Sequence, residues 1–323
     1  MSARPYTDER LDRFSISRSA PKADRETARL DLRPPTLAYL CPSVRTAQIQ
    51  FEPPGGRLPT NPSVCVHRGE LWCVVRGVNY SMNDRQQWVI HDPHNVVRTE
   101  NYLGRLRANG EFVGPRLMQD LDPTPRLRAI AVGYEDVRLV SIKGRLTGSA
   151  TVCDRHPNNM RRIVRLHLTP KGDVKRADLQ PTNQLHEKNW MPLSVDDKIT
   201  WIYSLDPTAI LPGPLRKCPF ALDHLRGGAA MAFKDGYLCI VHEVLPIDGK
   251  RVYLHRFIRL DSRFNVVAVS PAWVFKHYGI EFGAGIAPGR PGQLVLSYGI
   301  HDREAWIAHI DMREIEKMKW MKP

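Results

Sequence analysis

The sequence lacks the features that mark membrane and secreted proteins. No run of about 18 apolar residues occurs in it, so we expect no membrane-spanning helix. The first residues, MSARPYTDERLDRF, contain no apolar core of the kind found in a signal peptide. Together these two absences predict a cytoplasmic protein.

Motifs for metal binding and redox chemistry are also missing. The six cysteines form no CxxC pair, and most lie in apolar stretches such as SVCVH and YLCIVH, which predicts buried, reduced thiols. No HxH or HExxH spacing occurs. The nearest candidate, HDPH at residues 91–94, falls in a predicted loop, so we expect no bound metal.

Dense basic segments are absent although the chain carries a formal net charge of +13. No run of lysines and arginines, no basic helical stripe and no nucleic-acid-binding motif stands out. A basic surface attracts phosphate and other anions. We therefore interpret the charge as favouring a small anionic ligand, or plain solvation, over nucleic acid.

Helical periodicity is weak except in the last residues, and the 26 prolines favour many short elements joined by turns. One pattern recurs instead, in which an apolar strand is followed by a tight polar turn and a second apolar strand. Its copies are NPSVCVHRGELWCVVRGV (61–78), EDVRLVSIKGRLTGSATVC (135–153), KNWMPLSVDDKITWIYSLD (188–206), GGAAMAFKDGYLCIVHEV (227–244) and GAGIAPGRPGQLVLSYGIHD (283–302).

Each copy has RG, KG, DD, DG or PG at its centre, which is typical of a β-hairpin turn. Five such units with variable loops suit blades of about four strands each. The pattern therefore predicts an all-β protein, a five-bladed β-propeller over residues 46–323, with a β-sandwich as the competing architecture. Residues 1–45 lack the pattern and are predicted to form an arm or strap outside the propeller. The predicted turn residues are Gly69, Gly144, Asp197, Gly236 and Gly292.

Polar and charged residues recur at the same place in each copy. In a propeller the innermost strands line a central channel, and the starts of these strands face one of its mouths. Any one of these residues alone fits a turn cap or a surface ion pair, but their recurrence in every copy predicts a shared ligand site. Residues that flank the inner strands are Asn61, Glu135, Asp136, Arg138, Lys188, Asn189, Arg226 and Glu281, and the second strands end at Arg76, Asp206, His242 and Asp302.

The segment GYEDVR, at residues 133–138, resembles the G-x-E-D-P-R signature of glycoside hydrolase family 130. Members of this family are five-bladed propellers that phosphorolyse or hydrolyse mannosides. The similarity covers roughly residues 55–311 and extends to a related set of propeller-fold mannosyltransferases. Val137 replaces the proline of the signature, and Glu243 replaces a glycine of a later segment. The other similar segments are NPSVCVHRGELWCVVRG, EKNWMPL, GYLCIVHEV with YLHRFIRLD, and IEFGAGIAPGRPGQLVLSYGIHD.

The resemblance implies a role for each matched residue. Asp136 would be the general acid that protonates the leaving oxygen as the glycosidic bond breaks. Lys188, Arg226 and His242 match, or lie near, the positions that hold phosphate in the family. Residues implied to bind the sugar substrate are Asn61, Arg76, Glu135, Arg138 and Asp302.

Three functions remain open. The first is inverting phosphorolysis, or the reverse synthesis, of a β-linked mannoside, with phosphate or a sugar phosphate as substrate and no cofactor. The second is a glycosyltransferase that uses a nucleotide sugar or a sugar phosphate. The third is a non-catalytic sugar-binding propeller, which Asp136 and the cations disfavour. A hydrolase is also disfavoured because the basic residues persist, although Glu187 or Glu243 could supply a base. An oligosaccharide or sugar phosphate is the expected partner, and a homo-oligomer stays open.

Overall fold

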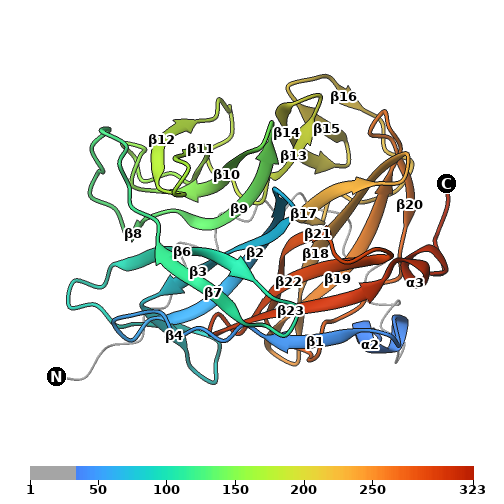
Figure 1. Ribbon diagram of the computed structural model, residues 1–323, viewed down its shortest axis with the longest axis horizontal. Helices are drawn as coiled ribbons and strands as arrows, with labels where there is room; N and C mark the ends of the chain where they lie inside the picture. The colour runs from blue at the N-terminus through green and yellow to red at the C-terminus, as the bar shows by residue number, and fades with distance from the viewer. Residues whose placement is uncertain (1–33) are drawn as a thin grey trace.

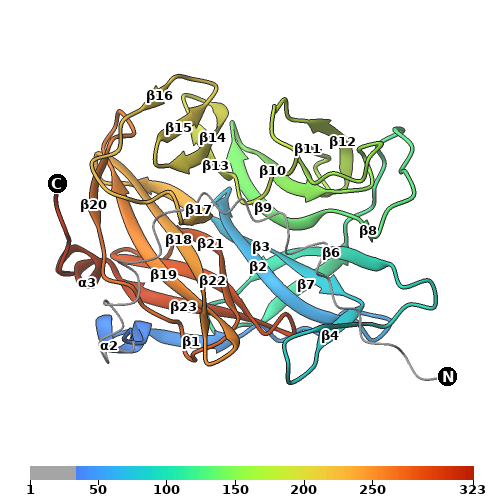
Figure 2. The same cartoon turned by 180° about the vertical axis from the view of Figure 1, so that it is seen from behind.

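The computed structural model describes residues 34–323, which form five β-sheets arranged as blades around a ring (Figure 1). This confirms the predicted all-β, five-bladed propeller. The view from behind shows the same succession of blades around the ring (Figure 2). The helices of the described residues are short, Leu37–Leu40 (α2) and Met312–Glu316 (α3). Neither they nor any other helix in the described part of the chain is long and apolar enough to cross a membrane.

The four main strands of each blade form an antiparallel sheet whose first strand lies innermost, and in blade 1 the short strand β8 (Ala131–Val132) pairs with β6 in parallel. From the inner to the outer strand, blade 1 contains β2 (Leu58–His67), β3 (Glu70–Val78), β6 (Val97–Leu106) and β7 (Phe112–Leu117), and blade 2 contains β9 (Glu135–Ile142), β10 (Arg145–Val152), β11 (Arg162–Leu168) and β12 (Val174–Leu179). In the same order, blade 3 contains β13 (Met191–Val195), β14 (Lys198–Leu205), β15 (Thr208–Leu211) and β16 (Leu215–Arg216), and blade 4 contains β17 (Arg226–Phe233), β18 (Gly236–Ile247), β19 (Lys250–Leu260) and β20 (Val266–Val269). Blade 5 contains β21 (Glu281–Pro288), β22 (Gln293–Ile300), β23 (Glu304–Asp311) and β1 (Arg45–Gln48).

The predicted hairpin turns join the two inner strands of each blade. In the turn between β2 and β3, Arg68 and Gly69 have φ of 52° and 78°. Lys143 and Gly144 adopt the same left-handed conformation between β9 and β10, at 49° and 67°. Two consecutive residues with positive φ match the right-handed twist of a hairpin, and glycine adopts this conformation without steric cost.

Five apolar clusters fill the spaces between neighbouring blades in the described residues, and together they form the core. The largest joins blades 4 and 5 through side chains such as Phe257 and Tyr298. Others join blades 3 and 4, blades 5 and 1, and blades 1 and 2. Blades 2 and 3 share a smaller cluster around Trp190 and Trp201. The alternating pattern of the sequence therefore buries apolar side chains on both faces of each sheet.

The ring is closed by a strand from the start of the described chain. β1 pairs with β23 of the last blade, from Arg45 opposite His309 to Gln48 opposite Trp306. The preceding helix α2 packs into the core through the buried Leu37. Of the arm predicted for residues 1–45, residues 1–33 lie outside the described residues, and residue 45 already belongs to β1.

Inner strands of four blades carry an extra residue near their first end. The pairing register shifts by one between Thr60 and Ser63 in β2 and in the corresponding part of β9, β17 and β21. Such a β-bulge bends the strand and re-aims a side chain. In blades 1 and 2 the bulges contain Asn61 and Asp136, so the local irregularity coincides with predicted site residues.

Candidate active site

Asp136 lies at the mouth of the channel between blades 1 and 2, where three predicted residues meet. Its Oδ1 atom accepts a hydrogen bond from Asn61 Nδ2 at 2.9 Å and an ion-pair contact from Arg76 Nη1 at 2.8 Å. The side chains of Arg76 and Asp136 are 6% and 14% exposed. Oδ2 receives no hydrogen bond from residues 34–323, so it is the oxygen available to a ligand.

The backbone explains how Asn61 and Asp136 come to face each other. Both have positive φ, 42° and 51°, inside the bulges of their strands. Asparagine and aspartate enter this left-handed region more readily than other residues with a side chain. Strained backbone of this kind persists where the surrounding structure enforces it and often marks a functional site.

Asp302 joins the same group from blade 5. It follows β22, has φ of 50°, accepts a hydrogen bond from Tyr80 OH at 3.2 Å, and lies 3.4 Å from Thr60 Oγ1. Thr60 also donates to Asn61 Oδ1 at 2.9 Å, which links Asp302 to the Asp136 group. Burial raises the pKa of Asp302, and the nearby Arg76 opposes this rise.

Gly299 makes room for this network. A Cβ atom at this position would lie 2.3 Å from Asn61 Oδ1 and 2.9 Å from Thr60 Oγ1. These separations are shorter than any van der Waals contact, so a larger residue would displace both side chains. The glycine of the SYG segment in β22 is therefore needed for the close approach of blades 5 and 1.

Glu135 and Lys188 form an ion pair across blades 2 and 3, with Lys188 Nζ 2.7 Å from Glu135 Oε1. Burial alone would raise the pKa of Glu135, but the positive charges of Lys188, Arg76 and Arg161 together lower it to about 2. Glu135 is therefore ionised at neutral pH and is not a proton donor there. Lys188, predicted to hold phosphate, is engaged by this carboxylate.

Arg138 reaches across the channel instead of lying beside Asp136. It is buried, its Nε atom donates to Gly228 O of blade 4 at 2.6 Å, and its Nη2 atom donates to Asn189 Oδ1 at 3.2 Å. Its guanidinium also lies 5.7 Å from the centre of the Phe282 ring of blade 5. Arg138 thus connects the inner strands of several blades and brings a positive charge to the axis.

His242 and Arg226 lie opposite each other on β18 and β17. His242 is buried between Tyr253, whose ring centre is 5.5 Å away, and Phe282, at 5.0 Å. Burial, with the charges of Arg138 and Arg226, lowers the pKa of His242 to about 3. The imidazole is therefore neutral at pH 7 and can offer a hydrogen bond to an anion, but no charge.

Arg226 is exposed, and its Nη1 atom donates to the carbonyl groups of Asp223 and Leu225. Two flanking residues from the sequence pattern have structural partners instead of facing a ligand. Asp206 accepts from Leu222 N at 3.2 Å, and Glu281 accepts from the backbone of residues 275–277. The polar residues that recur in the sequence therefore include residues at the channel mouth and residues that only accept hydrogen bonds from the backbone.

The structure adds residues that the sequence pattern did not indicate. Thr60, Tyr80 and Thr99 hydrogen-bond to the predicted residues, Thr99 by accepting from Arg76 Nε at 3.2 Å. Thr60 directly precedes Asn61, so its position beside the motif was a usable signal. Tyr80 and Thr99 lie outside the repeated hairpin, and no motif indicated them.

Metal and thiol chemistry receive no support from the described residues. No group of three or more histidine, cysteine, aspartate or glutamate side chains in residues 34–323 could hold a metal ion. In the HDPH loop, Asp92 pairs with Arg98 at 2.8 Å. All six cysteines are free; Cys65 and Cys218 are half-buried and the others are buried. Four of the six are thus buried, and the reduced state of the thiols stays a prediction.

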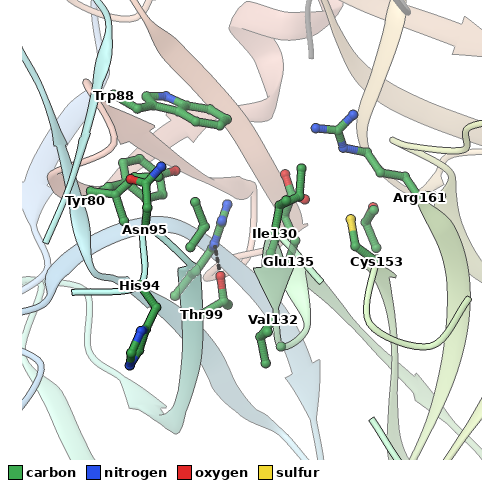
Figure 3. Close-up of a pocket in the computed structure, with 16 residues that line it drawn as sticks. Tyr80, Trp88, His94, Asn95, Thr99, Ile130, Val132, Glu135, Cys153 and Arg161 are labelled. Carbon is green, nitrogen blue, oxygen red and sulfur yellow. Dashed lines mark hydrogen bonds between the residues drawn. The ribbon is translucent and has the colours of Figure 1, made fainter. Parts of the chain in front are cut away.

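A cavity of about 260 Å³ opens beside Asp136, between blades 1 and 2. Arg76, Tyr80 and Glu135 line it and also belong to the site described above. Figure 3 shows Trp88 and Tyr80 on one side of the cavity, Arg161 and Cys153 on the other, and Glu135 between them. Asp136 itself does not line the cavity, but its sequence neighbour Glu135 and its ion-pair partner Arg76 do.

Comparison with known proteins yields solved structures only. No protein-family model matches the chain, and no curated protein matches it in sequence. A mannose phosphorylase from Leishmania mexicana, solved in complex with a phosphate ion, superposes with a TM-score of 0.56 at 14% identity, over 86% of this chain and 91% of that chain.

Two further structures share the fold with different chemistry. A GDP-Man-dependent mannosyltransferase from Leishmania mexicana has a TM-score of 0.53 at 14% identity and covers 83% of this chain and 90% of its own. The GH43_1 enzyme from Xanthomonas citri, complexed with xylose, has a TM-score of 0.56 at 12% identity, over 83% and 91%. The chain therefore shares the propeller fold of these three enzymes.

Proposed function

We propose that this chain is a carbohydrate-active enzyme that catalyses the inverting phosphorolysis of a β-linked mannoside, or its synthesis in reverse. The observation that carries the proposal is the carboxyl group of Asp136. It is fixed through Oδ1 by Asn61 and Arg76 at the mouth of a propeller, with Oδ2 left available to a ligand. A general acid must be held within hydrogen-bond reach of the leaving oxygen, and this geometry satisfies that need.

Asp136 would protonate the leaving glycosidic oxygen through Oδ2, while a phosphate oxygen attacks C1 of the mannose from the opposite face. Inversion of a β-mannoside in this way produces α-mannose 1-phosphate and a free acceptor hydroxyl group. Asn61 and Arg76 keep the carboxyl group oriented. In the synthetic direction the acceptor hydroxyl loses its proton to Asp136 as phosphate leaves.

The charge of the mouth supports phosphate as the nucleophile. The structure supplies cations from blade 2 (Arg138), from blade 4 (Arg226) and from the segment before blade 3 (Lys188). An anionic nucleophile needs positioned cations rather than a second catalytic base. No cofactor is required for this reaction.

The carboxylates that could serve a hydrolase already have partners. Glu187 is buried and accepts from Trp190 Nε1 at 3.0 Å, and Glu243 lies 3.6 Å from Arg256 Nη2. An inverting hydrolase needs a free carboxylate to activate water. These contacts support phosphorolysis over hydrolysis.

A glycosyltransferase is the second candidate, because a GDP-Man-dependent mannosyltransferase shares the fold. In that reaction the cations of the mouth would hold the phosphate of a nucleotide sugar. The two functions differ in the activated donor, so the choice of donor distinguishes them.

The experiment is to mix the protein with α-mannose 1-phosphate and a panel of sugar and non-sugar acceptors and to measure the release of inorganic phosphate. The same panel is offered with GDP-mannose, and the release of GDP is measured. Phosphate release supports the proposal, GDP release alone supports the transferase, and no release from either donor contradicts both. The Asp136→Asn variant is the control for contaminating activity.

A further inference from the structure

We propose that the cavity beside Asp136 is an acceptor subsite for an aromatic ring that carries a carboxylate group. The proposal rests on the proposed function, because it assigns the group attached to the oxygen that Asp136 protonates. The resemblance to mannoside phosphorylases does not supply this subsite. It follows from the residues that line this cavity.

One side of the cavity offers an aromatic and aliphatic surface. Trp88, from the hairpin of β4 (Tyr80–Met82) and β5 (Trp88–Ile90), packs against Tyr80 with ring centres 5.1 Å apart. Ile90, Val97 and Ile130 continue this surface around the cavity. Aromatic rings gain free energy both from burial and from contact with another ring. An aromatic group therefore fits this side better than a sugar alone.

The opposite side holds the guanidinium group of Arg161, whose positive charge acts on Glu135. Arg161 lines the cavity, and its Nε atom is buried with no hydrogen-bond partner among residues 34–323. The neighbouring carboxylate of Glu135 is already engaged by Lys188 at 2.7 Å. Arg161 is only half-buried, so the rest of its guanidinium group can donate to a ligand in the cavity. A carboxylate matches the fork of donors on arginine.

The walls of the cavity are fixed by ion pairs, so the site is formed before a ligand binds. The segment that carries residues 130–133 is held by Asp154, which is fully buried, pairs with Arg126 and accepts from Gly133 N at 3.1 Å. Arg155 donates to the hydroxyl of Tyr134, the residue that follows this segment, at 3.0 Å. A pre-formed pocket binds a rigid ring with little loss of side-chain entropy.

The cavity meets the reacting centre through Arg76 and Glu135, which belong to both. A ring joined to mannose through its glycosidic oxygen can therefore lie in the cavity while that oxygen faces Asp136. In synthesis, the hydroxyl oxygen of the acceptor bonds to C1 of mannose 1-phosphate, the bond from C1 to the phosphate oxygen breaks, and the hydroxyl proton passes to Asp136. The thiol of Cys153 takes no part, because burial raises its pKa to about 11.

The test measures binding in the absence of phosphate, so that no phosphorolysis occurs. The probes are methyl, phenyl and 4-carboxyphenyl β-mannoside, and their affinities are measured by calorimetry. We expect phenyl to bind about tenfold tighter than methyl through ring burial, and the carboxylate to add about another tenfold. Trp88→Ala should remove the gain of the ring, and Arg161→Gln only the gain of the carboxylate. Arg107→Gln, at an exposed ion pair with Glu111, is the matched control and should bind all probes as the native protein does.

Equal affinities for the three glycosides would overturn the proposal, and so would gains that survive both substitutions. Free 4-hydroxybenzoate separates this proposal from the proposed function. If it binds the native protein and binds each variant about tenfold more weakly, while methyl mannoside does not bind the protein, the subsite stands and the mannoside function fails. If methyl mannoside binds and 4-hydroxybenzoate does not, and the glycosides bind alike, the subsite fails and the mannoside function stands.

Discussion

At the scale of single residues, the environment of Asp136 decides what this carboxyl group can do. Oδ1 is occupied by Asn61 and Arg76, and the pair with Arg76 is largely buried. A carboxyl group held in this way is both a structural partner and a candidate acid. The two roles can be measured separately. Removing the charge of Asp136 weakens its ion pair with Arg76, which lowers stability, and removing its acidic proton lowers turnover.

Asp136→Asn should lower turnover by about two to four orders of magnitude, because an amide cannot deliver a proton at neutral pH. Asparagine also tolerates the positive φ of this position, so the backbone should keep its shape. The variant should lose about 1–3 kcal/mol of stability, since Arg76 keeps its hydrogen bonds but loses a charged partner. Turnover, mannoside affinity and melting temperature are measured together.

The matched control for this variant is Asp235→Asn, an exposed position in the hairpin turn between β17 and β18. It should behave as the native protein. A well-folded Asp136→Asn protein with near-native turnover would show that GYEDVR only ends a strand.

Phosphate affinity should depend on Arg226 and Lys188. Arg226→Ala should weaken inorganic phosphate binding about tenfold, because a charge-assisted hydrogen bond contributes about 1.5–3 kcal/mol. Lys188→Ala should weaken it at least as much, since its loss also leaves the charge of Glu135 without its partner. Calorimetric titration with phosphate measures both, with the exposed Lys175→Ala as control. Unchanged affinity in both variants would argue against phosphorolysis.

At the scale of elements, the bulged starts of the inner strands and the glycines beside them place the functional side chains. The bulge turns Asn61 and Asp136 toward each other from neighbouring blades. Gly299 lets β22 approach β2 closely enough for Asp302 to join them. The site therefore depends on how closely strands of different blades pack as much as on the residues that they carry.

Gly299→Ala should displace Asn61, because the added Cβ atom would lie 2.3 Å from its Oδ1 atom. We expect turnover to fall at least about tenfold and stability to fall by about 1–3 kcal/mol, as in other overpacked sites. Gly289→Ala, in the hairpin turn between β21 and β22, is the control, since its nearest neighbour would be a side chain at 3.2 Å. Native turnover in Gly299→Ala would mean that catalysis does not depend on the position of Asn61.

At the scale of the whole molecule, the interface between blades 4 and 5 combines aromatic packing with neutral histidines. His242 and His255 lie side by side, with ring centres 6.2 Å apart, and burial lowers the pKa of both. The positive charges of Arg138 and Arg226 lower the pKa of His242 further. A proton added here would place a second charge in a buried centre shared by several blades.

Acid should therefore destabilise the propeller through these histidines. Because the pKa of His242 is about 3 in the folded protein and about 6.5 in the unfolded chain, the stability that it contributes is complete above pH 6.5. That stability is lost as the pH falls from 6.5 toward 3, as the unfolded state takes up the proton first. When the pH falls from 6.5 to 5.5, the free energy of unfolding should decrease by about 1 kcal/mol more in the native protein than in His242→Gln.

Urea unfolding at each pH measures this difference. His94→Gln, at an exposed histidine, is the control and should keep the native dependence on pH. Parallel curves for the native protein and His242→Gln would show that His242 is not the group that is protonated.

The sequence by itself determined the class of fold and the number of blades, because alternating apolar residues and RG, KG, DD, DG or PG turns are local rules that each hairpin obeys alone. It also indicated that the polar residues flanking the strands belong together, which holds for Asn61, Arg76 and Asp136. The resemblance of GYEDVR to a known signature named the carboxyl group on which the proposed function depends.

Only the tertiary structure decided which atoms meet. Arg138 follows Asp136 by two residues in the motif, yet it reaches to Gly228 of another blade, because the β-bulge at Asp136 breaks the alternation that would otherwise place both side chains on one face of the strand. Tyr80, Trp88 and Arg161 belong to different strands and loops that carry no motif, so their convergence on one cavity depends on how blades 1 and 2 pack. The neutral state of His242 at pH 7 likewise follows from its burial, which depends on how the blades assemble and not on its neighbours in the sequence.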